Sequence, residues 1–375
     1  MKCCWLLLLL FTNVPLLRAA ERARDLGVPL EGTPGAWNAI TDVKPVEVGF
    51  QTLISGSGAS AVRTGVTAIW PRGKNDDAPA FGGWFSLNGN GEMTGTTWLE
   101  EGGLLSGPVL ITNTHSVGTV RDSFIKWQVG RKRAMGTGTN LWFLPVVAET
   151  WDGYLNDTNG FHVSEADTAA ALENAKSGPV AEGNTGGGTG MVCYGFKGGT
   201  GTSSRKSGQY TVGVLVQCNC GRRAQLRIAG VPVGEEMQNS APYSRNGAFR
   251  DADLGSIIIV VATDAPLLPT QLKRLARRAS LGLARTGSTS GNGSGDIFIA
   301  FSTANPQAGA TKGPISINMI PNDEMNPLFD ATVQATEEAI INAMLGAQTM
   351  TGYEGHTVIA LPHDRLKQVL QKYGR

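Results

Sequence analysis

Several short apolar runs bounded by glycine, proline or polar residues predict buried β-strands. Ile257–Val261 and Ile297–Phe301 are continuously apolar, as strands buried on both faces are. Val43–Phe50 alternates between apolar and polar residues, which indicates a strand with one exposed face. We expect further strands at Val66–Trp70, 80–98, 109–121, Leu141–Ala148, Met191–Phe196 and Tyr210–Gln217.

Apolar residues at helical spacing occur mostly in the second half of the chain. After Pro269, the residues Leu272, Leu275, Ala276, Ala279 and Leu283 fall on one helix face. We expect other helices at Ser164–Lys176, from Asn326–Pro327 to Gly346, and at His363–Lys372. Strands early and helices late favour an α+β fold with two packed sheets and helices outside, rather than alternating βαβ units.

Composition places the chain among globular proteins. Of its 375 residues, 41% are hydrophobic and 17% are charged, and the net charge is only +1. Because a nucleic-acid interface needs a large basic patch, we expect no nucleic-acid partner. The 50 glycines include a rich stretch at 183–205, but no Gly-Lys-Ser/Thr closes a strand-to-helix turn there. This argues against nucleotide binding.

The first 20 residues resemble a secretory signal. Lys2 precedes the short apolar run Trp5–Phe11, and Ala19–Ala20 offers a small-residue cleavage site. The alternative is a retained membrane anchor, although the run is short for a span. We therefore expect a secreted or periplasmic protein with no membrane partner.

Three cysteines remain once Cys3 and Cys4 are removed with the signal. Cys218 and Cys220 are separated by one residue, which is the wrong spacing for a zinc knuckle, and we expect no metal. Buried thiols are the favoured prediction. One disulfide from Cys193 to Cys218 or Cys220 is the alternative.

The chemistry of the chain is predicted to centre on Gly255–Ser256. This pair follows a polar stretch at 234–254 and immediately precedes the apolar run at Ile257. A turn into a strand is the simplest interpretation. A cut between the two residues would, however, place a hydroxyl nucleophile and an α-amine on Ser256, and that amine has an ordinary pKa of about 7.7–8.0.

A second polar cluster, Asn292–Asp296, stands before the next apolar run. It combines an amide, the Ser294 hydroxyl and the Asp296 carboxylate, a set that can hold an amine and relay a proton; a hairpin turn is the alternative. Ser294 is flanked by glycines but is followed by a strand, so it is not a nucleophile elbow. The four histidines are scattered, and we expect structural roles for His115, His162, His356 and His363.

At these two clusters the chain resembles the L-aminopeptidase/D-esterase (DmpA) family, which includes the β-peptidyl aminopeptidases. Residues 254–267 and 292–305 carry the resemblance, and 38–42, 149–157, 190–199 and 201–205 agree with it. The resemblance implies a four-layer αββα sandwich and a precursor that cuts itself before its serine. The products would be an α polypeptide at 21–255 and a β polypeptide at 256–375, often assembled as tetramers of αβ units.

The same resemblance implies roles for individual residues. Ser256 would be the nucleophile, and Ser294 and Asp296 would hold its amine. Asn219 would donate to the oxyanion together with a tyrosine, for which Tyr154 is the candidate; Trp151 is the alternative position. Glu149 would bind the substrate ammonium.

The sequence therefore predicts a self-processing serine aminopeptidase acting on short peptides, amides or esters with a free N-terminus, without a cofactor. An acyltransferase resembling ornithine acetyltransferase is one alternative, although those enzymes use threonine and need no export. A non-catalytic secreted binding protein on the same scaffold is the other.

Overall fold

The computed structural model describes residues 21–137, 141–238 and 255–375. The proposed signal at 1–20 and most of the polar stretch at 234–254 lie outside these residues. The beginning of that stretch is described, and part of it belongs to the short helix α4 (Val233–Glu236).

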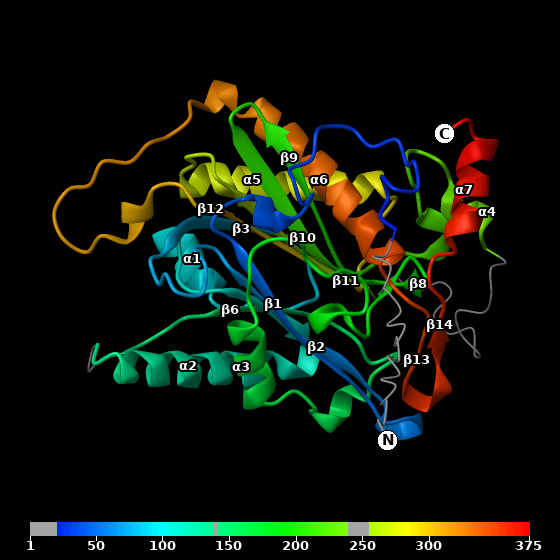
Figure 1. Cartoon of the computed structure of the whole chain (residues 1–375), viewed down its shortest axis with the longest axis horizontal. Coiled ribbons are helices and arrows are strands. Elements are labelled where there is room, and N and C mark those ends of the chain that lie inside the picture. Colours follow the sequence, from blue (N-terminus) through cyan, green and yellow to red (C-terminus); the bar gives the residue numbers. More distant parts are fainter. Residues whose placement is uncertain (1–20, 138–140, 239–254) are drawn as a thin grey trace, which may run out of the picture.

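Two β-sheets form the centre of the molecule (Figure 1). The four-stranded sheet has the order β1 (Glu47–Ser55), β2 (Val62–Trp70), β5 (Val109–Asn113) and β6 (Val146–Thr150). The six-stranded sheet has the order β4 (Leu104–Leu105), β3 (Ala80–Gly89), β12 (Gly295–Ser302), β11 (Ser256–Thr263), β10 (Tyr210–Asn219) and β9 (Gly199–Ser207). Two small hairpins pair β7 (Val192–Cys193) with β8 (Phe196–Lys197) and β13 (Met350–Thr351) with β14 (Thr357–Val358).

Strand β11 shows why the apolar runs predicted buried strands. Ile258, Val260 and Ala262 pack between the two sheets, with Ile69, Val109 and Ile111 of the four-stranded sheet in the same core. The alternate residues of β11 face the other way and pack beneath helices: Ile257, Ile259 and Val261. A strand covered on both faces must be apolar throughout, which the sequence of β11 satisfies.

Helices cover the outer face of each sheet. Helices α5 (Pro269–Arg285) and α6 (Asn326–Leu345) lie on the six-stranded sheet, while α2 (Val117–Ala134) and α3 (Glu165–Glu173) lie on the four-stranded sheet (Figure 1). Helix α1 (Thr96–Gly102) contributes Leu99 to the core between the sheets, and α7 (His363–Lys372) packs into the same core as α5 and α6. The predicted αββα sandwich is confirmed.

Several predicted elements were wrong in detail. The strand expected at 109–121 ends at Asn113, and the 18-residue helix α2 follows it. The strand expected at 80–98 ends at Gly89, and α1 begins at Thr96. The strand expected at Leu141–Ala148 begins only at Val146.

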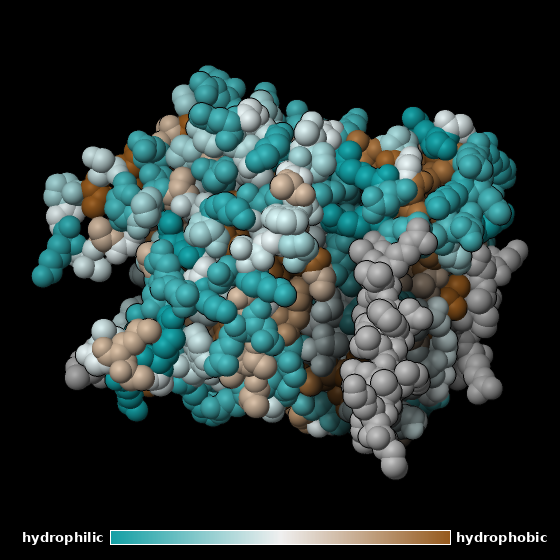
Figure 2. Space-filling model, viewed as in Figure 1, coloured by the Kyte–Doolittle hydropathy of each residue, from teal (hydrophilic) through white to brown (hydrophobic). Residues whose placement is uncertain are grey.

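The helix α2 also creates a βαβ unit that was not expected. Strands β5 and β6 are parallel and α2 connects them, just as α5 connects the parallel strands β11 and β12. Each sheet therefore contains one βαβ unit. No helix in the described part of the chain is long and apolar enough to cross a membrane, and hydrophilic residues dominate the face in Figure 2.

Candidate active site

Ser256 is the first residue of β11, the strand at the centre of the six-stranded sheet. Its antiparallel neighbour β10 ends at Asn219, which pairs directly with Ser256. Its parallel neighbour β12 begins at Gly295, which pairs with Ser256 from the other side. The register therefore brings together Asn219, Ser256 and the 294–296 segment, three regions that are far apart in the sequence.

Hydrogen bonds connect Ser256 to the second polar cluster. The Gly295 N–H donates to Ser256 Oγ at 3.1 Å. Ser294 Oγ donates to Asp296 Oδ1 at 2.7 Å, and the Ile257 N–H donates to the same oxygen at 3.2 Å. The short Asp296 side chain therefore reaches the β11 backbone one residue beyond Ser256. All three polar side chains of this group are buried: Ser256, Ser294 and Asp296.

Gly255 lies tightly against the end of β10. A Cβ atom added to Gly255 would lie 2.2 Å from the Asn219 carbonyl oxygen and 2.5 Å from Cys220 Cα. Both contacts are with backbone atoms and cannot be relieved by a change of rotamer. The position before Ser256 therefore requires glycine.

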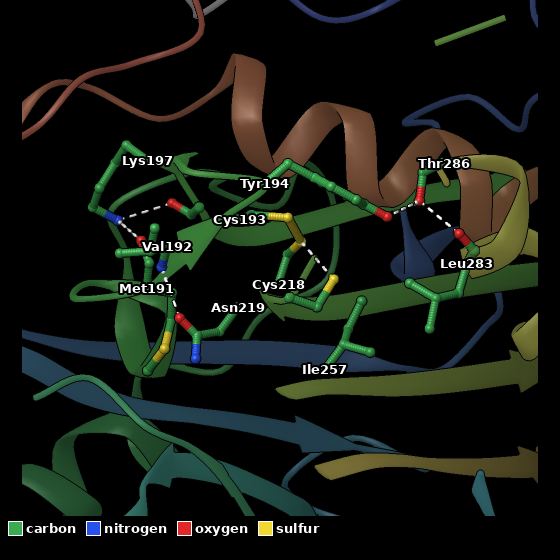
Figure 3. The surroundings of a disulfide bond; sticks show 12 residues. Met191, Val192, Cys193, Tyr194, Lys197, Cys218, Asn219, Ile257, Leu283 and Thr286 are labelled. Carbon is green, nitrogen blue, oxygen red and sulfur yellow. Dashed lines mark hydrogen bonds between the residues drawn. A yellow bond between two sulfur atoms is a disulfide. The ribbon is translucent and has the colours of Figure 1, made fainter. Parts of the chain in front are cut away.

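The Asn219 side chain is held in one orientation. Its Oδ1 accepts from the Val192 N–H at 2.8 Å (Figure 3), and its Nδ2 donates to the Trp151 carbonyl oxygen at 3.0 Å. An amide nitrogen carries two hydrogens, so Nδ2 has a second hydrogen that can be donated to a reacting oxygen.

Tyr154 is buried beside the groups that hold Asn219. It packs in a small cluster with Trp151 and Val192, and its ring stacks on His356 with centroids 4.4 Å apart. These contacts place Tyr154 near Asn219, but a donor role for its hydroxyl, or for Trp151, stays a prediction.

Glu149 lies near the end of β6 in the four-stranded sheet, and its carboxylate is buried. It accepts hydrogen bonds from the Thr114 hydroxyl and, at 3.0 Å, from the Glu92 N–H. Burial raises the pKa of Glu149, with smaller contributions from the charges of Glu92 and Asp152. No lysine, arginine or histidine among the described residues forms an ion pair with it.

Gly91 is packed closely between Glu149 and the first residue of β12 in the six-stranded sheet. A Cβ atom added to Gly91 would lie 3.1 Å from Gly295 Cα and 3.2 Å from Glu149 Oε1. Glu149 therefore faces the segment that contacts Ser256. Neither Gly91 nor Thr114 was recognised in the sequence, because each belongs to a connection whose position depends on the packing of the two sheets.

The prediction of three buried thiols was wrong for two of the cysteines. Cys193 of β7 and Cys218 of β10 form a disulfide (Figure 3), which was the alternative. Cys220 lies outside this bond, with its sulfur 3.9 Å from that of Cys218. These cysteines form the one group in the described part of the chain whose ligand atoms are close enough to hold a metal, and two of its three sulfurs are used by the disulfide.

The histidines have structural contacts, as expected. His162 Nε2 lies 3.0 Å from Asp157 Oδ2, and His363 Nε2 lies 3.1 Å from the Leu345 carbonyl oxygen. His356 stacks on Tyr154, and His115 stacks on Phe161. None of these contacts involves Ser256.

Two sheets between two layers of helices, with a serine at the start of a central strand, give this chain the architecture of a variant of the Ntn-hydrolase fold. The model of peptidase family S58 matches residues 38–358, and the chain belongs to this family. It is therefore a peptidase.

Two curated relatives are both beta-peptidyl aminopeptidase BapA. The protein from Sphingosinicella microcystinivorans is 54% identical, with 94% of this chain and 93% of the relative covered. The protein from Sphingosinicella xenopeptidilytica is 49% identical, with 94% and 92% covered.

Solved structures of similar proteins agree with this assignment. The L-aminopeptidase D-Ala-esterase/amidase of Ochrobactrum anthropi, a prototype of the serine aminopeptidases, is 50% identical with a TM-score of 0.88, covering 95% of this chain and 99% of its own. The beta-aminopeptidase of a Burkholderia species is 47% identical with a TM-score of 0.86, covering 94% and 99%. Neighbours at this level of identity confirm the fold and the aminopeptidase class of this chain.

Proposed function

We propose that this chain is a self-processing serine aminopeptidase in which Ser256 is the nucleophile. The observation that carries the proposal is the register of three strands, which brings the Asn219 amide, the Ser256 hydroxyl and the Ser294–Asp296 pair to one edge of the six-stranded sheet. These groups are the parts that acyl transfer needs: a nucleophile, a donor to the oxyanion and a carboxylate that orients an amine.

Self-cleavage would begin at the Gly255–Ser256 peptide bond. Ser256 Oγ attacks the Gly255 carbonyl carbon, the C–N bond breaks, and the acyl group moves to Oγ as an ester. The proton that leaves Oγ is delivered to the Ser256 nitrogen, which becomes a free amine. Water then hydrolyses this ester, leaving a carboxylate on Gly255. The hydrogen bond from the Gly295 N–H supports negative charge that develops on Oγ.

In turnover the Ser256 α-amine would be the general base. It takes the proton from Oγ as Oγ attacks the substrate carbonyl, and then gives that proton to the leaving amine or alcohol. Asn219 Nδ2, with Tyr154 as the predicted second donor, would stabilise the oxyanion. Water then attacks the acyl-enzyme in place of the leaving group, with the α-amine again taking and returning the proton. Asp296 and Ser294 would hold the amine, and no cofactor is needed for these steps.

Glu149 would select substrates with a free N-terminus. Its carboxylate is buried and accepts only neutral donors in the contacts described above, so a substrate ammonium would provide the opposite charge. Because the two curated relatives are beta-peptidyl aminopeptidases, we propose short peptides, amides or esters with an N-terminal β-amino acid as substrates. Amides and esters of α-amino acids should be assayed beside these substrates, because the similar Ochrobactrum anthropi enzyme is an L-aminopeptidase D-Ala-esterase/amidase.

We also propose export and self-association. The pattern at residues 1–20 supports a signal peptide, and a disulfide between Cys193 and Cys218 supports an oxidising compartment such as the periplasm or the exterior. A tetramer of αβ units is the expected assembly, and the mass of the purified protein in solution tests it.

The decisive experiment is denaturing electrophoresis of the purified protein with N-terminal sequencing of the fragments. We expect a small fragment that begins Ser256-Ile257-Ile258, and a single uncut chain without peptidase activity for Ser256→Ala. Ser280→Ala, on the outer side of α5, is the matched control and should be processed normally. Full activity from an uncut wild-type chain would refute the mechanism, and acetyl transfer to ornithine in place of hydrolysis would favour the acyltransferase.

A further inference from the structure

Lys197 is a lysine in the interior of the protein, close to the candidate active site. It belongs to β8, its side chain is fully buried, and its N–H donates to the Ile359 carbonyl oxygen at 2.7 Å. No carboxylate among the described residues forms an ion pair with it. Burial lowers the pKa of Lys197 to about 7. A buried amine is costly, and so the contacts of this one require an explanation.

The Lys197 amine bonds only to backbone carbonyls in the described contacts. Nζ donates to the Met191 oxygen at 2.9 Å (Figure 3). It also donates to the Gly198 oxygen, at 2.8 Å. The Gly198 N–H also donates to the Met191 oxygen, at 2.9 Å. The Met191 carbonyl is therefore fixed from two sides by neighbouring residues of one short segment.

The peptide group that begins with this carbonyl continues to Asn219. The carbonyl of the Met191–Val192 peptide accepts from Lys197, and the N–H of the same peptide donates to Asn219 Oδ1 at 2.8 Å. Figure 3 shows the two hydrogen bonds on either side of this segment. A hydrogen bond to a peptide oxygen polarises that peptide and strengthens the bond donated by its N–H. The Asn219 amide is polarised in turn, which makes its Nδ2 hydrogens better donors.

We propose that Lys197 is a positioning residue for the oxyanion donor: through the Met191–Val192 peptide it orients and polarises the Asn219 amide. The inference rests on the oxyanion role of Asn219 in the proposed function. Lys197 is fully buried and does not touch the substrate, so its effect appears in the transition state, where Asn219 donates to the negatively charged oxyanion, and not in substrate binding.

The test is the processed enzyme carrying Lys197→Met, which keeps the apolar stem of the side chain as far as the ε position and removes its donor. We expect kcat to fall about tenfold, the equivalent of one hydrogen bond, while KM changes less than about twofold. The matched control is Lys206→Met, an exposed lysine of β9 whose Nζ donates to Thr211 Oγ1, and it should keep wild-type kcat.

A double-mutant cycle distinguishes this role from a structural one. In an Asn219→Ala background, Lys197→Met should cause no further loss of kcat, because the group through which it acts is absent. A tenfold loss that is independent of Asn219, or wild-type kcat in Lys197→Met, would overturn the inference. Full activity of Asn219→Ala alone would instead overturn the oxyanion role, and the inference with it.

Lys197→Gln is the second test variant, for use if Lys197→Met does not accumulate as folded, processed protein. The glutamine amide nitrogen lies one atom short of the lysine Nζ, and so the donation to Met191 is weakened while the side chain stays polar. We expect the same dependence on Asn219, with a smaller loss of kcat. A Lys197→Gln enzyme with wild-type kcat would contradict the proposal.

Discussion

The two βαβ units of this protein contribute to the candidate site in opposite ways. In β11–α5–β12 the polar groups stand where the parallel strands begin, at Ser256 and at Gly295–Asp296. In β5–α2–β6 they stand where the parallel strands end, at Thr114 and Glu149. Apolar residues from the strands of both units share the core between the sheets, and the polar groups lie at opposite ends of those strands.

The two units also hold their polar groups in different ways. At the beginning of β11 and β12, the polar side chains bond to the backbone of these two neighbouring strands. The Gly295 N–H donates to Ser256 Oγ, and the Ile257 N–H donates to Asp296 Oδ1. At the end of β5 and β6, Glu149 is held by the Thr114 side chain and by the N–H of a separate connection at Glu92. We therefore expect the six-stranded side to govern the chemical step and the four-stranded side to govern substrate binding.

The largest effect should come from Asp296→Asn on the six-stranded side. The asparagine retains the shape of the side chain and an oxygen that can accept from Ser294. It loses the negative charge that would orient the Ser256 amine. We expect kcat to fall by about 10²–10⁴, self-cleavage to slow, and KM to change little. The time course of fragment formation measures self-cleavage, and steady-state kinetics of the processed fraction measure kcat and KM.

Asp330→Asn, an exposed aspartate on α6, is the control for loss of one carboxylate and should behave as wild type. If Asp296→Asn raised KM and left kcat unchanged, the two sides would not divide chemistry from binding as we infer.

A smaller effect, of another kind, is expected from Glu149→Gln on the four-stranded side. Loss of one charged hydrogen-bonding partner corresponds to about a 10–100-fold increase in KM, with a smaller change in kcat. An N-acetylated substrate has no ammonium, and so the variant and the wild type should handle it equally poorly. Glu101→Gln, an exposed glutamate, should leave KM unchanged.

The pH dependence of KM sharpens this prediction. Burial raises the pKa of Glu149 above its ordinary value, and only the ionised carboxylate attracts an ammonium. KM of the wild type should therefore rise as the pH falls through this raised pKa, and KM of Glu149→Gln should not. An equal rise in both enzymes would assign the titration to another group.

The two sides also differ in how much of them the sequence could predict. Ile257–Val261 and Ile297–Phe301 are long apolar runs next to polar clusters, so local pattern singled out Ser256, Ser294 and Asp296 as candidates, and the family resemblance supplied their predicted roles. The βαβ unit at β5 and β6 was missed because α2 buries few apolar side chains, among them Val120 and Phe124, and its polar residues conceal the helical period.

Other features depend on tertiary contacts that no local pattern contains. Glu149 was found through the family resemblance, but its partner Thr114 became visible only once β5 was placed beside β6. Lys197 is a lysine in an apolar segment, and its position against the Met191 carbonyl results from the β7–β8 hairpin. The cysteine pairing was undecidable because Cys218 and Cys220 are both close in sequence to the end of β10.

The smallest catalytic effect should come from the disulfide, which joins β7 to β10 and whose sulfur atoms take no part in the proposed reaction. Cys193→Ser opens a loop with a sequence separation of 25 residues, and a loop of this size corresponds to about 3.5 kcal/mol of stability in the chain-entropy model. The Val192 and Lys197 hydrogen bonds remain and hold Asn219 in the folded state, so kcat should change only about twofold. Chemical denaturation measures the first effect and steady-state kinetics the second, with Cys220→Ser, which leaves the disulfide intact, as the control. A loss of kcat as large as that of Asp296→Asn, without loss of stability, would mean that the covalent link, rather than the hydrogen bonds, orients Asn219, and the six-stranded side would then depend on oxidation for its chemistry.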